Sequence, residues 1–462
     1  MKTNRRLFLK TAGAATLFGL GGCSSFNMAG SAASPNGKIR MAFVGVGNRG
    51  GSNLQSFAFF KDLVDVVALC DTDMGGEATL PALKAFPSVP RYRDFRRMFD
   101  EMGSSIDAVC VSTPDFSHFP VAMLAMSLGK HVYVEKPIGN RFEEIELLTN
   151  AAARHGVVTQ MGNQGHSGGN YYQCRSLVES GFMRDVTRIE AFMCSPRRWH
   201  KYGGELKSMP PAETPPKTLD WNTWLSQRSE RGYSPAYMGG EWRCFYEYGT
   251  GPLGDWGAHI FSTLWEHLKL GLPSKIEVLK DEKRTDVVFP LASTTVFTFP
   301  ERGAGLPECR LVWRDGIGNF PDMPAKHPNS KWQRQSNGAE VYGADGRVFA
   351  RTSHAAPFVL VSGGDPHDPQ VKKALSDFPK PKYSSHYESF LRTIRGEDEV
   401  RSPFRIGGPL SQICALGSLA VELGDPVLNF DRKAKRFVAN DRANALLSGG
   451  EPRRGWEEFY RM

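Results

Sequence analysis

The sequence predicts an α/β fold in which an N-terminal, doubly wound parallel sheet precedes a second α/β domain. Three observations carry this prediction. From Lys38 onward, short β-prone runs alternate with helical stretches, which is the rhythm of parallel strands joined by helical crossovers. A glycine-rich turn follows the first run and opens a helical stretch. The chain has 462 residues, of which 40% are hydrophobic, and this length suits two or three domains with a substantial core.

Composition and charge exclude several classes of protein. Charged residues make up 23% of the chain and Gly and Pro are ordinary in frequency, so disorder, collagen-like repeats and disulfide scaffolds are excluded. The net charge of +8 includes Lys2, Arg5, Arg6 and Lys10, which lie in a segment predicted to be removed, and 8 minus 4 leaves +4. No basic run interleaved with aromatic residues occurs elsewhere, so nucleic acid is not an expected partner.

The first 23 residues are typical of a targeting segment. Arg5 and Arg6 directly precede a short Ala- and Gly-rich apolar stretch that resembles a twin-arginine export signal. The stretch closes with Leu20–Cys23, which resembles the lipobox of a bacterial lipoprotein, so Cys23 is expected to carry lipid; a chance cysteine after a signal cut elsewhere is the alternative. Residues 24–37 are small and polar, as in a flexible tether. We therefore expect a periplasmic or cell-envelope lipoprotein that contacts the membrane through this lipid alone, since no apolar run elsewhere approaches the length of a span.

Five parallel strands are predicted in residues 38–162. Each is a short run rich in β-branched or aromatic residues, and helical sequence separates them. The strands are Ile39–Val44, Val64–Leu69, Ala108–Ser112, His131–Glu135 and Val157–Met161, and the clearest helices are Phe119–Leu128 and Phe142–His155.

The glycine-rich turn predicts a dinucleotide site. Residues 45–50 fit the pattern GxGxxG after a strand, and an acid follows a second strand about 20 residues later. Glycines let the backbone approach a pyrophosphate, the helix N-terminus offers it unpaired N–H groups, and the acid accepts hydrogen bonds from ribose hydroxyls. The acid would repel a 2′-phosphate, so NAD is favoured and NADP stays possible because an arginine lies in the turn. The predicted cofactor-binding residues are Gly45, Gly47, Asn48, Arg49, Gly50 and Asp71.

Further candidates follow from the position of ligands in doubly wound sheets. Such ligands lie outside the carboxyl ends of the strands. The residues at or just past those ends are Thr113, Pro114, His118, Glu135, Lys136, Asn163 and Gln164.

The combined motifs resemble one family of oxidoreductases. Three motifs resemble those of the Gfo/Idh/MocA family. They are the GxGxxG turn with its acid, Ser112-Thr113-Pro114 with His118, and Glu135-Lys136-Pro137, of which the last is the most specific. Residues 219–225 and 249–259 resemble its exported branch. The resemblance implies a Rossmann domain at 38–162 and a substrate and oligomerisation domain at 163–462. It also implies that the second domain has a large, open, mostly antiparallel sheet, and that the chain forms a dimer or tetramer.

The C-terminal sequence agrees locally with that implication. Two β-rich runs, Thr187–Met193 and Thr285–Phe299, are predicted, and Glu340–Val348 contains a glycine-rich hairpin turn. Tyr387–Arg395 and Leu410–Leu423 are predicted to be helices.

Three residues are the candidate catalytic set. Hydride transfer from an alcohol needs a group that takes the hydroxyl proton and charge that stabilises the developing alkoxide. Asp255 and His259 are four residues apart, which places both on one face of a helix. Taken alone, Asp255 is equally typical of a helix cap and His259 of an ordinary helical histidine. The resemblance implies that His259 is the general acid/base, that Lys136 orients the hydroxyl and that Asp255 holds the imidazole.

Substrate contacts are less sharply indicated. Arginine and aromatic side chains near a sugar supply hydrogen bonds and a flat apolar face, which favours His200, Trp242 and Arg243. No spacing of histidines, cysteines and acids suits a metal, so none is expected.

Export bears on the expected reaction. No pool of free nicotinamide nucleotide is expected outside the cytoplasm, so the cofactor must travel bound and be regenerated in place. The primary hypothesis is an NAD(P)-dependent oxidoreductase acting on a carbohydrate or polyol hydroxyl. One alternative is a glycosidase or epimerase that oxidises C3 transiently, as some relatives in the family do. A sugar sensor that binds nucleotide without turnover is the third hypothesis, and retention of Lys136, Asp255 and His259 speaks against it.

Overall fold

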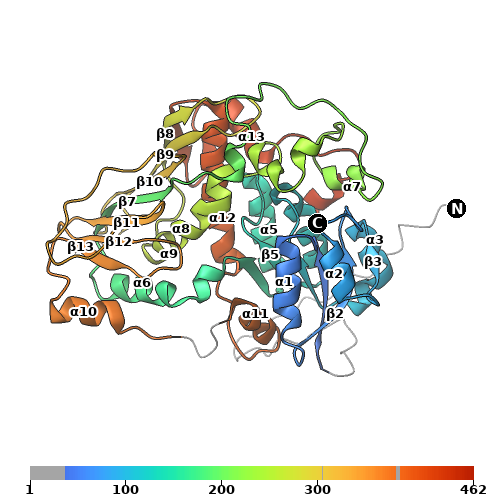
Figure 1. The fold of residues 1–462 in the computed structure, drawn as a ribbon, viewed down its shortest axis with the longest axis horizontal. Coiled ribbons are helices and arrows are strands. Elements are labelled where there is room, and N and C mark those ends of the chain that lie inside the picture. Colours follow the sequence, from blue (N-terminus) through green and yellow to red (C-terminus); the bar gives the residue numbers. More distant parts are fainter. Residues whose placement is uncertain (1–36, 304, 381–384) are drawn as a thin grey trace. The chain divides into compact units, whose positions relative to one another are not determined.

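The computed structural model describes residues 37–303, 305–380 and 385–462 (Figure 1). The predicted export signal at 1–23, with Cys23, and nearly all of the predicted tether at 24–37 lie outside the described residues.

A parallel sheet forms the first part of the fold. Within the described residues it has six strands in the order β3-β2-β1-β4-β5-β6, and every pairing is parallel. β4 is fully buried, because helices cover both faces of the sheet. The doubly wound arrangement predicted from the sequence is therefore confirmed. Its elements are β1 (Ile39–Val44), α1 (Arg49–Ala58), β2 (Val64–Cys70), α2 (Leu80–Ala85), β3 (Arg91–Tyr92), α3 (Phe95–Met102), β4 (Ala108–Val111), α4 (His118–Ser127), β5 (His131–Glu135), α5 (Phe142–His155) and β6 (Thr159–Gly162).

A large mixed sheet forms the second part. In the described ranges its order is β13-β12-β11-β7-β10-β9-β8-β14-β15, with antiparallel pairings throughout except β10 with β7. The predicted mostly antiparallel sheet is confirmed. Its strands are β7 (Val186–Met193), β8 (Lys275–Glu282), β9 (Ala292–Phe299), β10 (Cys309–Asp315), β11 (Asn337–Gly343), β12 (Val348–Arg351), β13 (Val359–Ser362), β14 (Val427–Asp431) and β15 (Arg436–Phe437).

Two local predictions for this sheet have different outcomes. The hairpin is present, since β11 pairs with β12 and Gly346 in the turn has a φ of +83°. The predicted β-rich run Thr285–Phe299 is wrong in its first half. There the hydroxyl of Thr285 accepts hydrogen bonds from the N–H groups of Val287 and Val288, and this local turn delays the strand until Ala292.

One long helix, α12 (Phe404–Leu423), runs between the two sheets (Figure 1). It begins six residues before the predicted start, and its small residues allow close packing: a Cβ at Gly408 would lie 2.1 Å from Oγ1 of Thr149 in α5. Its length and hydropathy would suit a membrane span, contrary to the expectation that no such run exists. However, 83% of the apolar window is buried inside the protein, so α12 is a core helix.

The remaining helices follow β6 in the sequence. They are α6 (Gly169–Glu179), α7 (Trp221–Leu225), α8 (Ala258–Ile260), α9 (Ser262–His267), α10 (Pro369–Ser376), α11 (His386–Ile394) and α13 (Asp441–Ser448).

Late segments of the chain also pack on the parallel sheet. In α11, Phe390 lies with its ring centroid 6.0 Å from that of Phe57 in α1. Near the C-terminal end of the sequence, Trp456 and Phe459 both have ring centroids 6.0 Å from that of Phe95 in α3. The core around the first sheet is thus completed by residues more than 200 positions beyond its last strand.

Candidate active site

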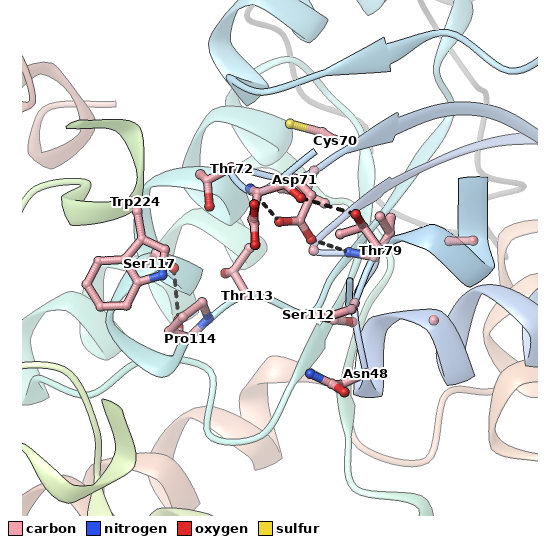
Figure 2. A pocket seen from close by; sticks show the side chains of 18 of the residues that line it. Asn48, Cys70, Asp71, Thr72, Thr79, Ser112, Thr113, Pro114, Ser117 and Trp224 are labelled. Carbon is pink, nitrogen blue, oxygen red and sulfur yellow. Dashed lines mark hydrogen bonds between the residues drawn. The ribbon is translucent and has the colours of Figure 1, made fainter. Parts of the chain in front are cut away.

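A cavity of about 750 Å³ opens at the carboxyl ends of β1, β2 and β4 (Figure 2). Asp71 and Thr113 contribute to its wall on the side of the parallel sheet, and Trp224 does so from α7 (Figure 2). Residues 237–240 and Trp242 also line it, so segments of the second part of the chain cover a cavity made mainly by the first. Of the predicted cofactor residues, Gly45, Gly47, Asn48, Asp71, Thr113 and Pro114 line this cavity.

The turn between β1 and α1 has room only for glycine at two positions. Gly45 has a φ of +82°, and a Cβ there would lie 2.6 Å from the carbonyl oxygen of Ser112. A Cβ at Gly50 would lie 2.0 Å from the carbonyl oxygen of Gly45. In the described part of the chain, the N–H groups of Asn48 and Arg49 have no hydrogen-bond partner, and no side chain caps α1. The turn therefore presents unpaired donors at a helix N-terminus, which fits a pyrophosphate.

The carboxylate of Asp71 lies where the second strand ends. It accepts hydrogen bonds from the N–H of Val46 at 2.8 Å and of Asp73 at 3.0 Å, which orients both oxygens. Burial raises its pKa, although these backbone donors act in the opposite direction. Two polar atoms at the cavity, Oδ1 of Asp73 and Oγ1 of Thr113, are buried without a partner among the described residues. These acceptors fit the hydroxyl groups of a nucleotide ribose, so the cavity suits a dinucleotide.

Three predicted cofactor residues lie beside the cavity rather than in it. Nε of Arg49 is 3.1 Å from Oε1 of Glu135, and its Nη2 donates to the hydroxyl of Tyr387. Gln164 donates to the hydroxyl of Tyr133 at 2.8 Å. Arg49 was expected to weaken the repulsion between Asp71 and the 2′-phosphate of NADP. Its guanidinium is instead paired with Glu135, which does not support that expectation.

His118 also differs from its predicted role. It is buried, and its Nδ1 and Nε2 lie 2.8 Å from the carbonyl oxygens of Pro137 and Thr113, respectively. His118 does not line the cavity, so the structure does not place it where a cofactor contact was predicted. Instead it ties the loop after β4 to the loop after β5, which carries Lys136.

The three candidate catalytic residues come together, with different pairings from those expected. Nζ of Lys136 donates to Oδ1 and to the main-chain carbonyl of Asp255, both at 2.6 Å. Asp255 lies in a π-helical turn, Leu253–Gly257, that leads into α8. His259 instead pairs with Asn163, whose Oδ1 is 2.9 Å from Nδ1 of the imidazole. The role of Asp255 is therefore corrected from holding the imidazole to holding Lys136.

The hydrogen bonds of Asn163 fix the protonation state of the imidazole. Nδ2 of Asn163 donates to the carbonyl of Ala258 at 3.0 Å, so Oδ1 faces the imidazole as an acceptor. Nδ1 of His259 must then carry the hydrogen, which leaves Nε2 with a free lone pair. Burial and the neighbouring charge of Lys136 lower the pKa of His259, so the ring is neutral near neutral pH.

Asp255 is held as an anion. Burial alone would raise its pKa, but the positive charges of Lys136 and Arg243 outweigh burial and lower the pKa well below its usual range. Nε of Arg243 lies 3.7 Å from Oδ1 of Asp255. Arg243, which the sequence suggests as a substrate contact, therefore lies beside Asp255.

The other two predicted substrate contacts, Trp242 and His200, lie in different surroundings. Trp242 lines the nucleotide cavity, with the guanidinium carbon of Arg243 4.0 Å from its ring centroid. His200 accepts from the N–H of Arg197 at Nδ1, and its Nε2 is 3.2 Å from Oδ1 of the buried Asp315. Both ring nitrogens are occupied, so the geometry does not support His200 as a hydrogen-bonding contact to substrate.

Sequence reasoning missed a wall of the site. Trp256 lies beside His259, and the guanidinium carbon of Arg197 is 4.2 Å from the Trp256 ring centroid. His354, in the loop after β12, has its ring centroid 5.1 Å from that of His259. Trp256 adjoins Asp255 and so could have been noticed, but no local pattern marks Arg197 or His354. Over the described ranges, no group of three or more histidine, cysteine, aspartate or glutamate side chains could hold a metal ion.

Two family profiles match the chain. One, described as an oxidoreductase family with an NAD-binding Rossmann fold, matches residues 39–163. The other, described as the C-terminal alpha/beta domain of an oxidoreductase family, matches residues 168–298.

Individual proteins are also similar. A glycosyl hydrolase family 109 protein of Shewanella pealeana is 26% identical over 307 residues, which span 62% of this chain and 64% of that protein, less than two thirds of its length. An alpha-N-acetylgalactosaminidase of Shewanella oneidensis is 28% identical over 403 residues, 74% of this chain and 84% of that protein. The WlbA dehydrogenase of Bordetella pertussis, crystallised with NADH and UDP-GlcNAcA, superposes with a TM-score of 0.57 at 16% identity, covering 85% of this chain and 99% of that one, and this likeness shows the fold.

Proposed function

This chain belongs to the Gfo/Idh/MocA oxidoreductase family, and from that premise we propose that it oxidises a secondary hydroxyl of a carbohydrate with NAD held in the cavity above β1, β2 and β4. The observation that carries the proposal is the neutral imidazole of His259, whose Nδ1 is held by Asn163, beside the ammonium group of Lys136. NAD supplies the acceptor for the hydride when it is bound.

The residues of the chain divide the remaining work. Nε2 of His259 takes the hydroxyl proton, because its lone pair is free. Lys136 donates a hydrogen bond to the hydroxyl oxygen and stabilises the negative charge that develops there. Asp255 fixes the position of Lys136 through two contacts of 2.6 Å. Each of the three residues therefore has one role in the proposed reaction.

Glycoside cleavage through transient oxidation is the second candidate. The imidazoles of His259 and His354 are 5.1 Å apart, so the site holds two groups able to exchange protons. Net oxidation of an alcohol needs one such group, whereas cleavage that begins with oxidation needs more than one. The names of the similar Shewanella proteins support this candidate. A nucleotide-bound sugar sensor is disfavoured because Lys136, Asp255, Asn163 and His259 form a complete set of contacts.

NAD is proposed over NADP. Asp71, Asp73 and Glu77 line the cavity, and three carboxyl groups disfavour a 2′-phosphate. Arg93, which also lines it, is the one feature at that end that favours an anion. The balance of charge supports NAD.

Location and assembly are proposed from the sequence. The paired arginines and Cys23 support export by the twin-arginine route as a periplasmic or cell-envelope lipoprotein. An open sheet face typical of the family supports a homo-oligomer. The proposed substrate of the protein is a small sugar or glycoside.

One experiment separates these functions. Protein purified with its bound cofactor is mixed with sugars and with p-nitrophenyl α-N-acetylgalactosaminide, and the nicotinamide absorbance and p-nitrophenol release are followed together. Lasting reduction by a sugar supports net oxidation, and release without lasting reduction supports transient oxidation. If protein that still holds NAD shows neither nicotinamide reduction nor p-nitrophenol release, both catalytic functions are contradicted and a sensor is favoured.

A further inference from the structure

A second imidazole lies beside the one already assigned. His354 reaches the site from the loop between β12 and β13, and its ring is inclined by 35° to that of His259 at a centroid distance of 5.1 Å. Trp256 packs edge-on against His354, with ring centroids 5.7 Å apart. We propose that His354 is a second acid–base residue, which takes a substrate proton other than the hydroxyl proton taken by His259; this assignment rests on the proposed glycoside-cleaving function.

The backbone of His354 is held in place from two sides. Its carbonyl oxygen accepts a hydrogen bond from Nδ2 of Asn170 at 2.7 Å and from Nη1 of Arg351 at 3.2 Å. Asn170 lies in α6 and Arg351 in β12, so two separate elements fix the position of the loop. These two hydrogen bonds restrain the backbone that carries the His354 ring.

The orientation of the ring follows from its surroundings. Nδ1 of His354 is buried without a partner in the described part of the chain, so this nitrogen has no hydrogen bond from the protein. Cδ2 is 3.9 Å from the position that a Cβ would take on Gly165. Gly165 is two residues beyond Asn163, which holds His259. The Cδ2 edge of His354 therefore lies against the loop that also carries Asn163.

His354 is chemically able to act as a base. Burial lowers its pKa, and the charges of Arg351 and Lys136 lower it further, so its ring is neutral near neutral pH. The ring nitrogens of His118 both lie against main-chain carbonyl oxygens, and those of His200 both have polar partners, so neither ring is available. His354 differs because none of the described residues donates to or accepts from its ring nitrogens.

Cleavage through transient oxidation has a step that such a base would serve. Once the C3 hydroxyl has given its proton to His259 and C3 its hydride, for which NAD would be the acceptor when bound, the new carbonyl at C3 acidifies the C–H at C2. His354 takes the C2 proton, the C–H electron pair forms the C1–C2 double bond, and the C1–O bond breaks with its pair leaving on oxygen. Water then adds its hydroxyl to C1 and a proton to C2. As the hydride returns to C3, His259 returns its proton to the C3 oxygen, and the proton held by His354 passes to the oxygen that left C1. No external oxidant is consumed.

The two proton transfers can be measured separately. In D2O, the wild-type protein with bound NAD is mixed with p-nitrophenyl α-N-acetylgalactosaminide, and three signals are recorded: nicotinamide reduction, p-nitrophenol release, and deuterium at C2 by mass spectrometry. His354→Ala and His354→Gln are compared with His367→Ala, which removes an exposed histidine from another loop.

The expected result is selective for one step. Both His354 variants should reduce their bound nicotinamide within a few-fold of the wild-type rate. They should lose p-nitrophenol release and deuterium incorporation by about 10²-fold or more, which is the usual effect of losing an acid–base group. Added imidazole should restore part of the release in His354→Ala and none in His354→Gln, where the side chain fills the space. His367→Ala should match wild type in all three signals.

Other outcomes overturn the assignment in different ways. Wild-type deuterium incorporation in His354→Ala would overturn it alone, and so would an equal loss of all three signals, since that would show only a role in shaping the site. A wild-type protein that holds NAD but shows neither reduction nor deuterium incorporation with this glycoside would overturn the cleaving function, and the role of His354 with it.

Discussion

The side-chain amide of Asn163 sets the tautomer of His259. Its Nδ2 is committed to the carbonyl of Ala258 at 3.0 Å, so its Oδ1 can only accept the hydrogen on Nδ1 of the imidazole, 2.9 Å away. The unprotonated nitrogen of the neutral ring is consequently Nε2. The tautomer of His259, which lies in α8, thus depends on a residue that directly follows β6.

Replacing Asn163 tests this dependence. Asn163→Ala should slow reduction of the bound nicotinamide by about 10-fold or more, a part of the full acid–base contribution, because the ring can then rotate or change tautomer. Single-turnover absorbance measures the rate, and gel filtration of the variant checks that the nucleotide stays bound. A wild-type rate in Asn163→Ala would show that the imidazole is oriented by other contacts.

Replacing the two groups that handle the hydroxyl tests their assignment. Lys136→Ala and His259→Ala should each lower the rate of hydride transfer by about 10²-fold or more, with the cofactor still bound. The double variant should fall short of the product of the two losses, because both groups act on one proton transfer. The exposed Lys61→Ala serves as the control. Unchanged rates in His259→Ala would assign the proton to another group, with Lys136 the first to examine.

Asp255→Asn should cost less than either of those changes. The amide keeps an oxygen near Lys136, and the main-chain carbonyl of residue 255 still accepts from Nζ, but the negative charge that fixes the ammonium is lost. The same single-turnover rates decide the order of the three variants. A loss in Asp255→Asn larger than that in Lys136→Ala would mean that Asp255 acts on the substrate directly.

Asp71 should decide between the two nicotinamide nucleotides. Asp71→Ala should weaken binding of NAD more than that of NADP, since it removes an acceptor for ribose hydroxyls and a charge that repels a 2′-phosphate. Calorimetric titration of nucleotide-free protein compares the two affinities, with the exposed Asp62→Ala as a control. Protein that binds neither nucleotide before any substitution would contradict the cofactor assignment.

Acid should destabilise the protein through its buried histidines. Burial lowers the pKa of His166 to about 3 and of His131, His267 and His386 to about 4, whereas the unfolded chain has values of about 6.5. Below about pH 6.5 the unfolded state binds more protons, so the free energy of unfolding should fall as pH falls toward 4, by at most about 1.4 kcal/mol per pH unit for each histidine. Denaturant titrations across this range measure the slope. A protein that becomes more stable on acidification would contradict the prediction.

Export and lipidation can be tested directly in cells. Changing Arg5 and Arg6 to Lys should block export, because the twin-arginine route requires the arginine pair. Cys23→Ser should release active protein from the membrane fraction. Mass spectrometry of the mature N-terminus checks both, and a mature protein without lipid that begins elsewhere would refute the lipoprotein prediction.

Local sequence predicted the parallel strands closely. β1 and β5 have the predicted bounds, because each is an apolar run that a glycine or a proline follows closely, and α5 ends as predicted where Gly156 takes the left-handed conformation. β3 was missed because a two-residue strand carries no periodicity. The first half of the 285–299 run has β-prone residues, but the hydroxyl of Thr285 makes a turn there instead.

The sequence predicted which residues form the site, but it did not predict which of them are hydrogen-bonded to each other. Motifs brought Lys136, Asp255 and His259 together, yet the partner of His259 lies 96 positions away and was expected only at the cofactor. A hydrogen bond between such distant residues depends on how the two sheets pack, which no local pattern records. His354 was missed for the same reason, since it reaches the site from the loop between β12 and β13, at one edge of the mixed sheet.

The return of late segments to the first sheet sets an order of events during synthesis. The ring of Phe57 in α1 receives Phe390, and that of Phe95 in α3 receives Trp456 and Phe459, so these apolar surfaces stay open while the ribosome makes the intervening residues. The nucleotide-binding part is therefore incomplete as a nascent chain and closes only after translation has passed position 459. A chaperone that shields α1 and α3 in that interval, or a cofactor that binds only afterwards, would act on a nearly finished polypeptide.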